Sequence, residues 1–169
     1  MLKLAGIAGD SIVDGPGIRT TYFAQGCPHH CEGCHNPETW DFGGGTPWEA
    51  EALADIAREN PLCKGVTFSG GEPFAQPEGF AALAEILRRE GYEIAAYTGY
   101  LFEELQNGTA AQRRLLGLLD VLIDGRFELR RRSLELPFRG SRNQRIIDVP
   151  KSLAAGEIVP APPRWQGEY

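Results

Sequence analysis

The chain has 169 residues, of which 42% are hydrophobic and 24% charged, and its net charge is −6. A chain of this length forms one domain with a buried core, and the acidic balance argues against a general nucleic-acid binder. No apolar run is long enough for a membrane helix, and the first residues lack a signal-peptide core. We therefore expect a single compact cytoplasmic domain over residues 1–169, with no membrane and no direct nucleic-acid contact.

The first half of the chain predicts strands and helices in alternation. Residues 19–24 are rich in β-formers and lead into a loop that contains cysteines. Residues 46–49 combine an N-cap hydroxyl, a proline for the first helical position and a capping-box glutamate, which predicts a helix from there to just before Pro61. Residues 65–69 read as a buried strand that ends in Gly-Gly.

The second half continues this alternation. Helices are expected at 77–90, 101–105 and 110–119, and strands at 93–97, 121–123 and 145–149. The proline-rich tail at 160–169 is expected to be loosely held. Such alternation predicts an α/β fold with a mostly parallel sheet, whose functional site lies at the carboxyl ends of the strands.

Three of the four cysteines lie within eight residues, as Cys27-x3-Cys31-x2-Cys34. In a reducing compartment, clustered thiols indicate metal or redox chemistry before disulfides, and thiolates suit both iron–sulfur clusters and zinc. With three ligands, a cluster keeps one iron open for a substrate. The alternative is a structural zinc site completed by a histidine at position 29, 30 or 35, and ligand type alone leaves both open.

Several motifs around and after this loop occur in a family's order. They are SIVDGPGIR (11–19), QGC (25–27), CHNPETWD (34–41), TFSGGEP (67–73), YTGY (97–100), VLIDG (121–125) and FRGSRNQ (138–144). Over about residues 10–150 the chain resembles the glycyl-radical-enzyme activases of the radical SAM superfamily. It is most similar to the branch that activates the anaerobic (class III) ribonucleoside-triphosphate reductase.

The resemblance implies a fold and a reaction. The fold would be a partial (β/α)6-type radical SAM barrel, and Cys27, Cys31 and Cys34 would bind one 4Fe-4S cluster whose open iron takes S-adenosyl-L-methionine. Reductive cleavage of this molecule would generate a glycyl radical on the large subunit of the anaerobic reductase, with electrons from a flavodoxin-type reductant. No catalytic residue is expected beyond the cluster and the cofactor.

The resemblance also implies residues near the adenine. The superfamily usually has an aromatic residue before its third cysteine, and here Gly33 precedes Cys34. His35, directly after Cys34, is a candidate to supply a ring in its place.

Further cofactor-binding residues are implied at three strand ends. Gly70 and Gly71 would let the backbone approach the methionine moiety. Glu72 would accept a hydrogen bond from its amino group or fix the turn. Thr98 and Asp124 would contact the carboxylate or ribose, or else act only as strand-end caps.

Residues 126–145 carry seven arginines against two glutamates. This segment is either a solvated face or a docking surface for an acidic partner. Two other functions remain open at this point. One is activation of a different glycyl-radical enzyme, of the pyruvate formate-lyase type, and the other is a zinc-binding interaction module without catalysis.

Overall fold

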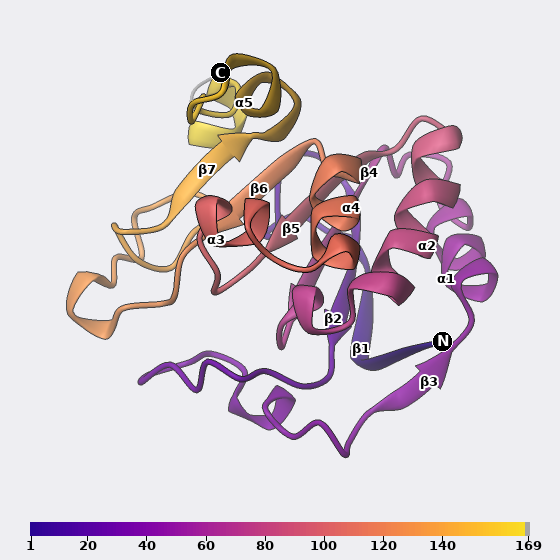
Figure 1. Ribbon diagram of the computed structural model, residues 1–169. Coiled ribbons are helices and arrows are strands. Elements are labelled where there is room, and N and C mark those ends of the chain that lie inside the picture. Colours follow the sequence, from indigo (N-terminus) through magenta and orange to yellow (C-terminus); the bar gives the residue numbers. More distant parts are fainter. Residues whose placement is uncertain (168–169) are drawn as a thin grey trace.

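A single mixed sheet organises the protein, and the computed structural model describes residues 1–167 of it (Figure 1). Its strands lie in the order β3-β1-β2-β4-β5-β6-β7. Their bounds are β1 Leu2–Ser11, β2 Arg19–Ala24, β3 Thr46–Trp48, β4 Gly65–Gly70, β5 Glu93–Tyr97, β6 Val121–Asp124 and β7 Arg145–Asp148. β2, β4, β5 and β6 run parallel, whereas β1, β3 and β7 pair antiparallel at the two sides.

The helices follow the strands as the sequence predicts. They are α1 Ala50–Arg58, α2 Pro77–Arg89, α3 Phe102–Gln106, α4 Ala110–Leu118 and α5 Val149–Ala155, with short 3-10 turns at Pro37–Thr39, Pro73–Ala75, Leu129–Arg131 and Pro163–Gln166. Local signals set their ends: Thr109 caps α4 by accepting a hydrogen bond from the Gln112 backbone N–H. No helix within residues 1–167 is both long and apolar enough to cross a membrane.

The predicted α/β class is confirmed, but the barrel is not. The sheet is not closed within residues 1–167, because β3 and β7 form its two free edges. The antiparallel β7 ends the parallel series after four strands.

The predicted helix start at residues 46–49 is wrong. Residues Thr46–Trp48 form the edge strand β3, which pairs with β1 through Leu4↔Thr46 and Leu2↔Trp48. Pro47 suits an edge strand, where a missing N–H costs no ladder hydrogen bond. No strand is predicted for residues 2–11, so the prediction lacked the partner that pairs with these residues in the sheet.

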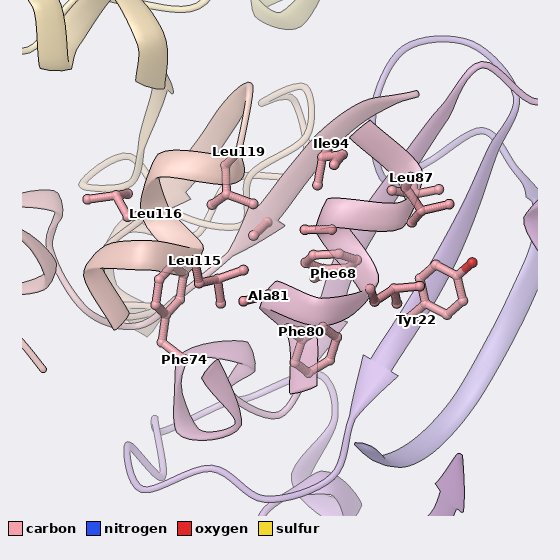
Figure 2. Packing of buried hydrophobic residues seen from close by; sticks show 14 of the residues in the cluster. Tyr22, Phe68, Phe74, Phe80, Ala81, Leu87, Ile94, Leu115, Leu116 and Leu119 are labelled. Carbon is pink, nitrogen blue, oxygen red and sulfur yellow. The ribbon is translucent and has the colours of Figure 1, made fainter. Parts of the chain in front are cut away.

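The main core lies between the sheet and helices α1, α2 and α4 (Figure 2). Phe68 of β4 packs against Phe80 of α2 with ring centroids 4.8 Å apart, and Leu87 and Ile94 are fully buried beside them. Fully burying a side chain of this size stabilises the fold by roughly 1.5–3 kcal/mol.

A smaller core covers the other face of the sheet. Ala95, Val121 and Ile146 point to that face and pack with Trp165, which is fully buried. The Ala161 N–H donates to the Ile146 carbonyl at 2.9 Å. The tail predicted to be loose is therefore packed against the sheet as far as Gln166. Glu168 and Tyr169 lie outside the described residues.

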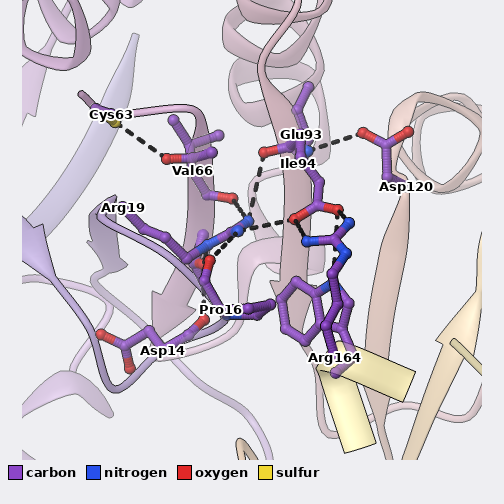
Figure 3. Close-up of polar contacts among 12 residues, drawn as sticks. Asp14, Pro16, Arg19, Cys63, Val66, Glu93, Ile94, Asp120 and Arg164 are labelled. Atoms are coloured by element: carbon purple, nitrogen blue, oxygen red, sulfur yellow. Dashed lines mark hydrogen bonds and ion pairs between the residues drawn. The ribbon is translucent and has the colours of Figure 1, made fainter. Parts of the chain in front are cut away.

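A buried arginine joins the amino ends of the parallel strands. Arg19 is 1% exposed and donates to Thr67 Oγ1 at 2.9 Å, to the Val66 carbonyl at 2.9 Å and to the Glu93 carboxylate at 2.8 Å (Figure 3). The ring of Trp165 lies 5.0 Å from its guanidinium carbon. The same carboxylate also pairs with Arg164, so this network holds the C-terminal segment to the sheet.

Candidate active site

A cavity of about 550 Å³ opens at the carboxyl edge of the parallel strands. Its walls include the turns after β4, β5 and β6, where Gly70, Gly71, Thr98, Gly99 and Gly125 lie. Two long connections complete it: the cysteine loop, residues 26–45 between β2 and β3, and the rim loop, residues 126–144 between β6 and β7. This is the position at which parallel α/β sheets bind ligands.

Three of the four cysteines, all within the described part of the chain, line this cavity. Cys27, Cys31 and Cys34 are half-buried, and the Cys34 N–H donates to the Cys31 carbonyl at 3.1 Å. Cys63 precedes β4 near the opposite edge of the sheet, is 4% exposed and donates its S–H to the Gly65 carbonyl at 3.2 Å. Cys63 is therefore a small buried residue that does not line the cavity.

Burial raises the pKa of the Cys27 and Cys31 thiols, and backbone N–H groups of the loop offset part of this rise at Cys27. The metal-ligating form is the thiolate, which nearby positive charge favours. Three soft donors along one wall of a cavity this size fit an iron–sulfur cluster. Within residues 1–167, no group of three or more His, Cys, Asp or Glu side chains is arranged to hold a single metal ion.

Glu72 lies behind the cavity wall, where its carboxylate joins the cysteine loop to the sheet. It is fully buried and accepts hydrogen bonds from Thr98 Oγ1 at 2.9 Å and from the Gly99 N–H at 2.8 Å. The Phe74 N–H donates to it at 3.0 Å, and His29 Nε2 lies 2.7 Å from it. Of the two roles expected for Glu72, this placement corresponds to fixing the turn.

Asp124 also faces inward. It is fully buried and accepts hydrogen bonds from the Phe102 N–H at 2.8 Å and from Arg145 Nε at 3.0 Å. The side chain does not line the cavity, whereas the adjacent Gly125 does. These contacts correspond to the capping alternative, and the contact of Asp124 with a cofactor stays a prediction.

The two glycines after β4 lie on the cavity wall and against the base of the cysteine loop. A Cβ on Gly71 would lie 2.4 Å from the Gly26 carbonyl oxygen. The Gly71 N–H donates to Ala24 and the Glu72 N–H to Gly26, each at 2.8 Å. Besides facing the cavity, Gly70–Gly71 thus lets β4 approach the chain where the cysteine loop begins.

The residues expected near adenine occupy different positions. His35 lines the cavity, and its ring meets that of Phe127 edge-on with centroids 5.2 Å apart. Gly33 is exposed and is not among the residues that line the cavity, and a Cβ there would lie 2.8 Å from Leu129 Cδ1 and 3.3 Å from Phe127 Cε1. Thr98 reaches the wall, although its hydroxyl group donates to Glu72.

Sequence reasoning missed much of the wall. Cavity-lining residues that it did not identify as site residues include Trp40, Phe127, Leu134, Leu136, Phe138 and Arg139. The available signal was the FRGSRNQ motif at 138–144, whose Arg139, Gly140 and Gln144 face the cavity. The apolar cavity-lining residues that precede this motif lie in no sequence pattern that would indicate a site.

Comparison with known proteins defines first a class and then a family. A family model described as a 4Fe-4S single cluster domain matches residues 13–147. Anaerobic ribonucleoside-triphosphate reductase-activating proteins of Pasteurella multocida, Salmonella typhi and Escherichia coli are 39%, 36% and 35% identical to this chain. The alignments cover 80%, 79% and 79% of this chain and 90% of each relative. The chain belongs to the family of anaerobic ribonucleoside-triphosphate reductase-activating proteins.

A solved structure, that of QueE from Escherichia coli, is similar with a TM-score of 0.40 and 21% identity. The match covers 59% of this chain and 49% of that chain. A likeness of this size is too weak to define the fold.

Proposed function

We propose that this protein is a radical SAM activase that generates a glycyl radical on the large subunit of an anaerobic ribonucleoside-triphosphate reductase. The observation that carries the proposal is the joint placement of Cys27, Cys31 and Cys34 on one wall of the cavity, in a chain of this family. Cys63 does not line that cavity, so the thiolates of Cys27, Cys31 and Cys34 would hold one 4Fe-4S cluster. When bound, the cluster supplies the single electron that cleaves S-adenosyl-L-methionine.

The residues around the cysteines then bind and orient that molecule. Gly70 and Gly71 offer the methionine end of S-adenosyl-L-methionine a stretch of wall without side chains. The Gly71 N–H already donates a hydrogen bond to the Ala24 carbonyl. His35 and Phe127 present two rings at the cavity wall, next to Cys34, where an adenine ring can stack.

The chain also holds the site rigid and keeps water out. Glu72 fixes the turns after β4 and β5 relative to His29, which lies between two of the cysteines. Leu136 and Phe138 give the opposite wall an apolar surface. Such a wall limits the side reactions of a radical with solvent.

The partners are a target and a reductant. The relatives' names point to the anaerobic reductase as the target. A flavodoxin-type protein is the proposed electron donor, and the arginines of the rim loop suit its acidic surface. The cytoplasm remains the predicted location.

The test is anaerobic reconstitution with iron and sulfide. The wild-type protein is expected to hold about four irons and to form reductant-dependent 5′-deoxyadenosine. With the reductase large subunit it should produce a glycine-centred signal in electron paramagnetic resonance. Serine at position 27, 31 or 34 should abolish all three readouts, whereas Cys63→Ser, the matched control, should retain them.

The same experiment separates the alternatives. Colourless protein that binds one zinc and forms no 5′-deoxyadenosine would establish the interaction module instead. A radical on a pyruvate formate-lyase type enzyme, and none on the reductase, would move the protein to another activase branch.

A further inference from the structure

The cavity is lined by residues from segments of different chemistry. Cys27, Cys31, Cys34, His35 and Trp40 come from the cysteine loop. Val13 and Asp14 come from the turn after β1, and a further set comes from the rim loop: Arg132, Ser133, Leu134, Leu136, Phe138, Arg139 and Gly140. The proposed binding of the cluster and S-adenosyl-L-methionine assigns no contact to Val13, Asp14, Arg132 or Leu134.

The rim loop is held in place by contacts at its base and near its end. Arg132 and Ser141 form a β-bridge at its base, and the Ser133 N–H donates to the Gly140 carbonyl at 3.2 Å. Near its end Phe138 has a φ of +58°, which is rare for a bulky residue. The Tyr97 hydroxyl group holds this residue by donating to the Phe138 carbonyl at 2.6 Å.

Large apolar side chains are exposed on the rim loop and on the turn after β1. Leu134 is 88% exposed, and Ile12 and Val13 are 71% and 72% exposed. Leu134 and Val13 lie on the cavity wall, with Ile12 directly beside Val13. Exposed apolar side chains grouped around a cavity mouth indicate an interaction surface.

Unpaired positive charge surrounds these side chains. The rim loop carries six arginines against two glutamates, in a chain whose net charge is −6. Within residues 1–167, the side chains of Arg126, Arg130, Arg132 and Arg142 make no ion pair with a carboxylate. A segment that carries carboxylates beside apolar groups complements such a surface.

We propose that the rim loop and residues 12–14 form the docking surface for a polypeptide segment of the reductase that carries apolar and acidic side chains. The apolar groups pack on Ile12, Val13 and Leu134, and the carboxylates face the free arginines. The segment thereby delivers its glycine into the cavity that the cysteines also line. This inference rests on the proposed function, because it takes the reductase as the target.

Anaerobic titration of the reductase large subunit against the cluster-loaded protein tests the surface directly. Ile12→Asp and Leu134→Asp are expected to weaken binding about tenfold, since each places a charge in an apolar contact. Leu62→Asp is the matched control, because Leu62 is 65% exposed but precedes Cys63 near the other edge of the sheet. Its affinity should equal that of the wild type. Arg130→Glu should weaken binding at low salt and have little effect at high salt.

Two further readouts separate docking from chemistry. For Ile12→Asp and Arg130→Glu, the glycyl radical yield at subsaturating reductase should fall with the affinity. With a small chemical reductant in place of a flavodoxin-type protein, formation of 5′-deoxyadenosine without reductase should stay at the wild-type rate. Wild-type affinity in both Ile12→Asp and Leu134→Asp would overturn the docking surface even if the wild-type protein activates the reductase. Conversely, if the wild-type protein forms no 5′-deoxyadenosine, the proposed reaction fails while the affinities still report on docking.

Discussion

Two fully buried charged side chains lie at opposite edges of the parallel sheet. Arg19, near the amino ends of the strands, donates to Thr67, to Val66 and to Glu93 (Figure 3). Glu72, just after the carboxyl end of β4, accepts from Thr98, Gly99 and Phe74 and lies against His29. Both satisfy the rule that a buried charge must be paired and hydrogen-bonded.

The two groups differ in what their partners do. The partners of Arg19 belong to strands β4 and β5, and the carboxylate it binds also holds Arg164 of the C-terminal segment. The partners of Glu72 belong to turns and a loop that line the cavity. The same pairing rule therefore stabilises the fold near the amino ends of the strands and shapes the candidate site near their carboxyl ends.

The largest expected effect on stability follows from removing the charged side chain of Arg19, near the amino ends of the parallel strands. Arg19→Met removes the donor to the Val66 carbonyl and the buried partner of Glu93, which then keeps only Arg164 and Trp165. Removing one partner of a buried ion pair costs about 3–5 kcal/mol. Denaturant unfolding of the cluster-free protein should show this loss. Arg114→Met, at an exposed ion pair with Glu85, should change stability by less than about 1 kcal/mol. Equal losses in the two variants would remove the distinction.

Replacing Glu72, near the carboxyl ends of the strands, should lower the free energy of unfolding less than replacing Arg19, but it should alter the candidate site more. Glu72→Gln replaces an acceptor oxygen by an NH2 group facing internal donors, which costs about 1–3 kcal/mol. Because the turn then shifts relative to His29, the reconstituted variant should also show less iron or an altered cluster spectrum. Glu78→Gln, on the exposed first turn of α2, is the control. Normal iron content and spectrum in Glu72→Gln would show that the carboxylate does not shape the site.

The contact between β4 and the cysteine loop can be tested by adding one methyl group. Gly71→Ala places a Cβ against the Gly26 carbonyl, and overpacking of this kind costs about 1–3 kcal/mol. Iron loading should fall with it, because that carbonyl lies next to Cys27. Gly117→Ala in α4 has no atom within 4 Å of the new methyl group and should be neutral or stabilising. Full iron loading by Gly71→Ala would contradict this reading.

The smallest effect is a pH dependence at the amino edge. Burial raises the pKa of Glu93, but hydrogen bonds and charge from Arg164 and Arg19 more than offset it, so the net pKa lies below its usual value. Ionised Glu93 therefore stabilises the fold above the unfolded-state pKa, and that stabilisation is lost as the pH falls through the folded-state pKa. Acid unfolding curves of wild type and Glu93→Gln should converge at low pH. A constant difference between them down to the lowest pH would contradict the assignment.

The features of this protein that depend on local sequence signals could be predicted from the sequence alone. The spacing of Cys27, Cys31 and Cys34 indicates a metal centre because thiolate ligands on one short loop need no distant partner to be recognised. The central strands and helices α2 and α4 follow from hydrophobic periodicity and from caps such as Thr109, which act within a few residues. These signals were sufficient for the α/β class and for the edge of the sheet that holds the cavity.

The orientation of the buried carboxylates and the position of the edge strand could not be predicted from the sequence, because both depend on long-range contacts. Thr46–Trp48 carries the local signs of a helix start, but pairing with β1, more than forty residues away, makes it a strand. Glu72 and Asp124 both follow or end a strand and suit a cofactor, yet their partners Thr98 and Arg145 come from distant segments and turn them inward. The physical reason is that a carboxylate is oriented by the donors that surround it, and those donors are brought together only when the chain folds.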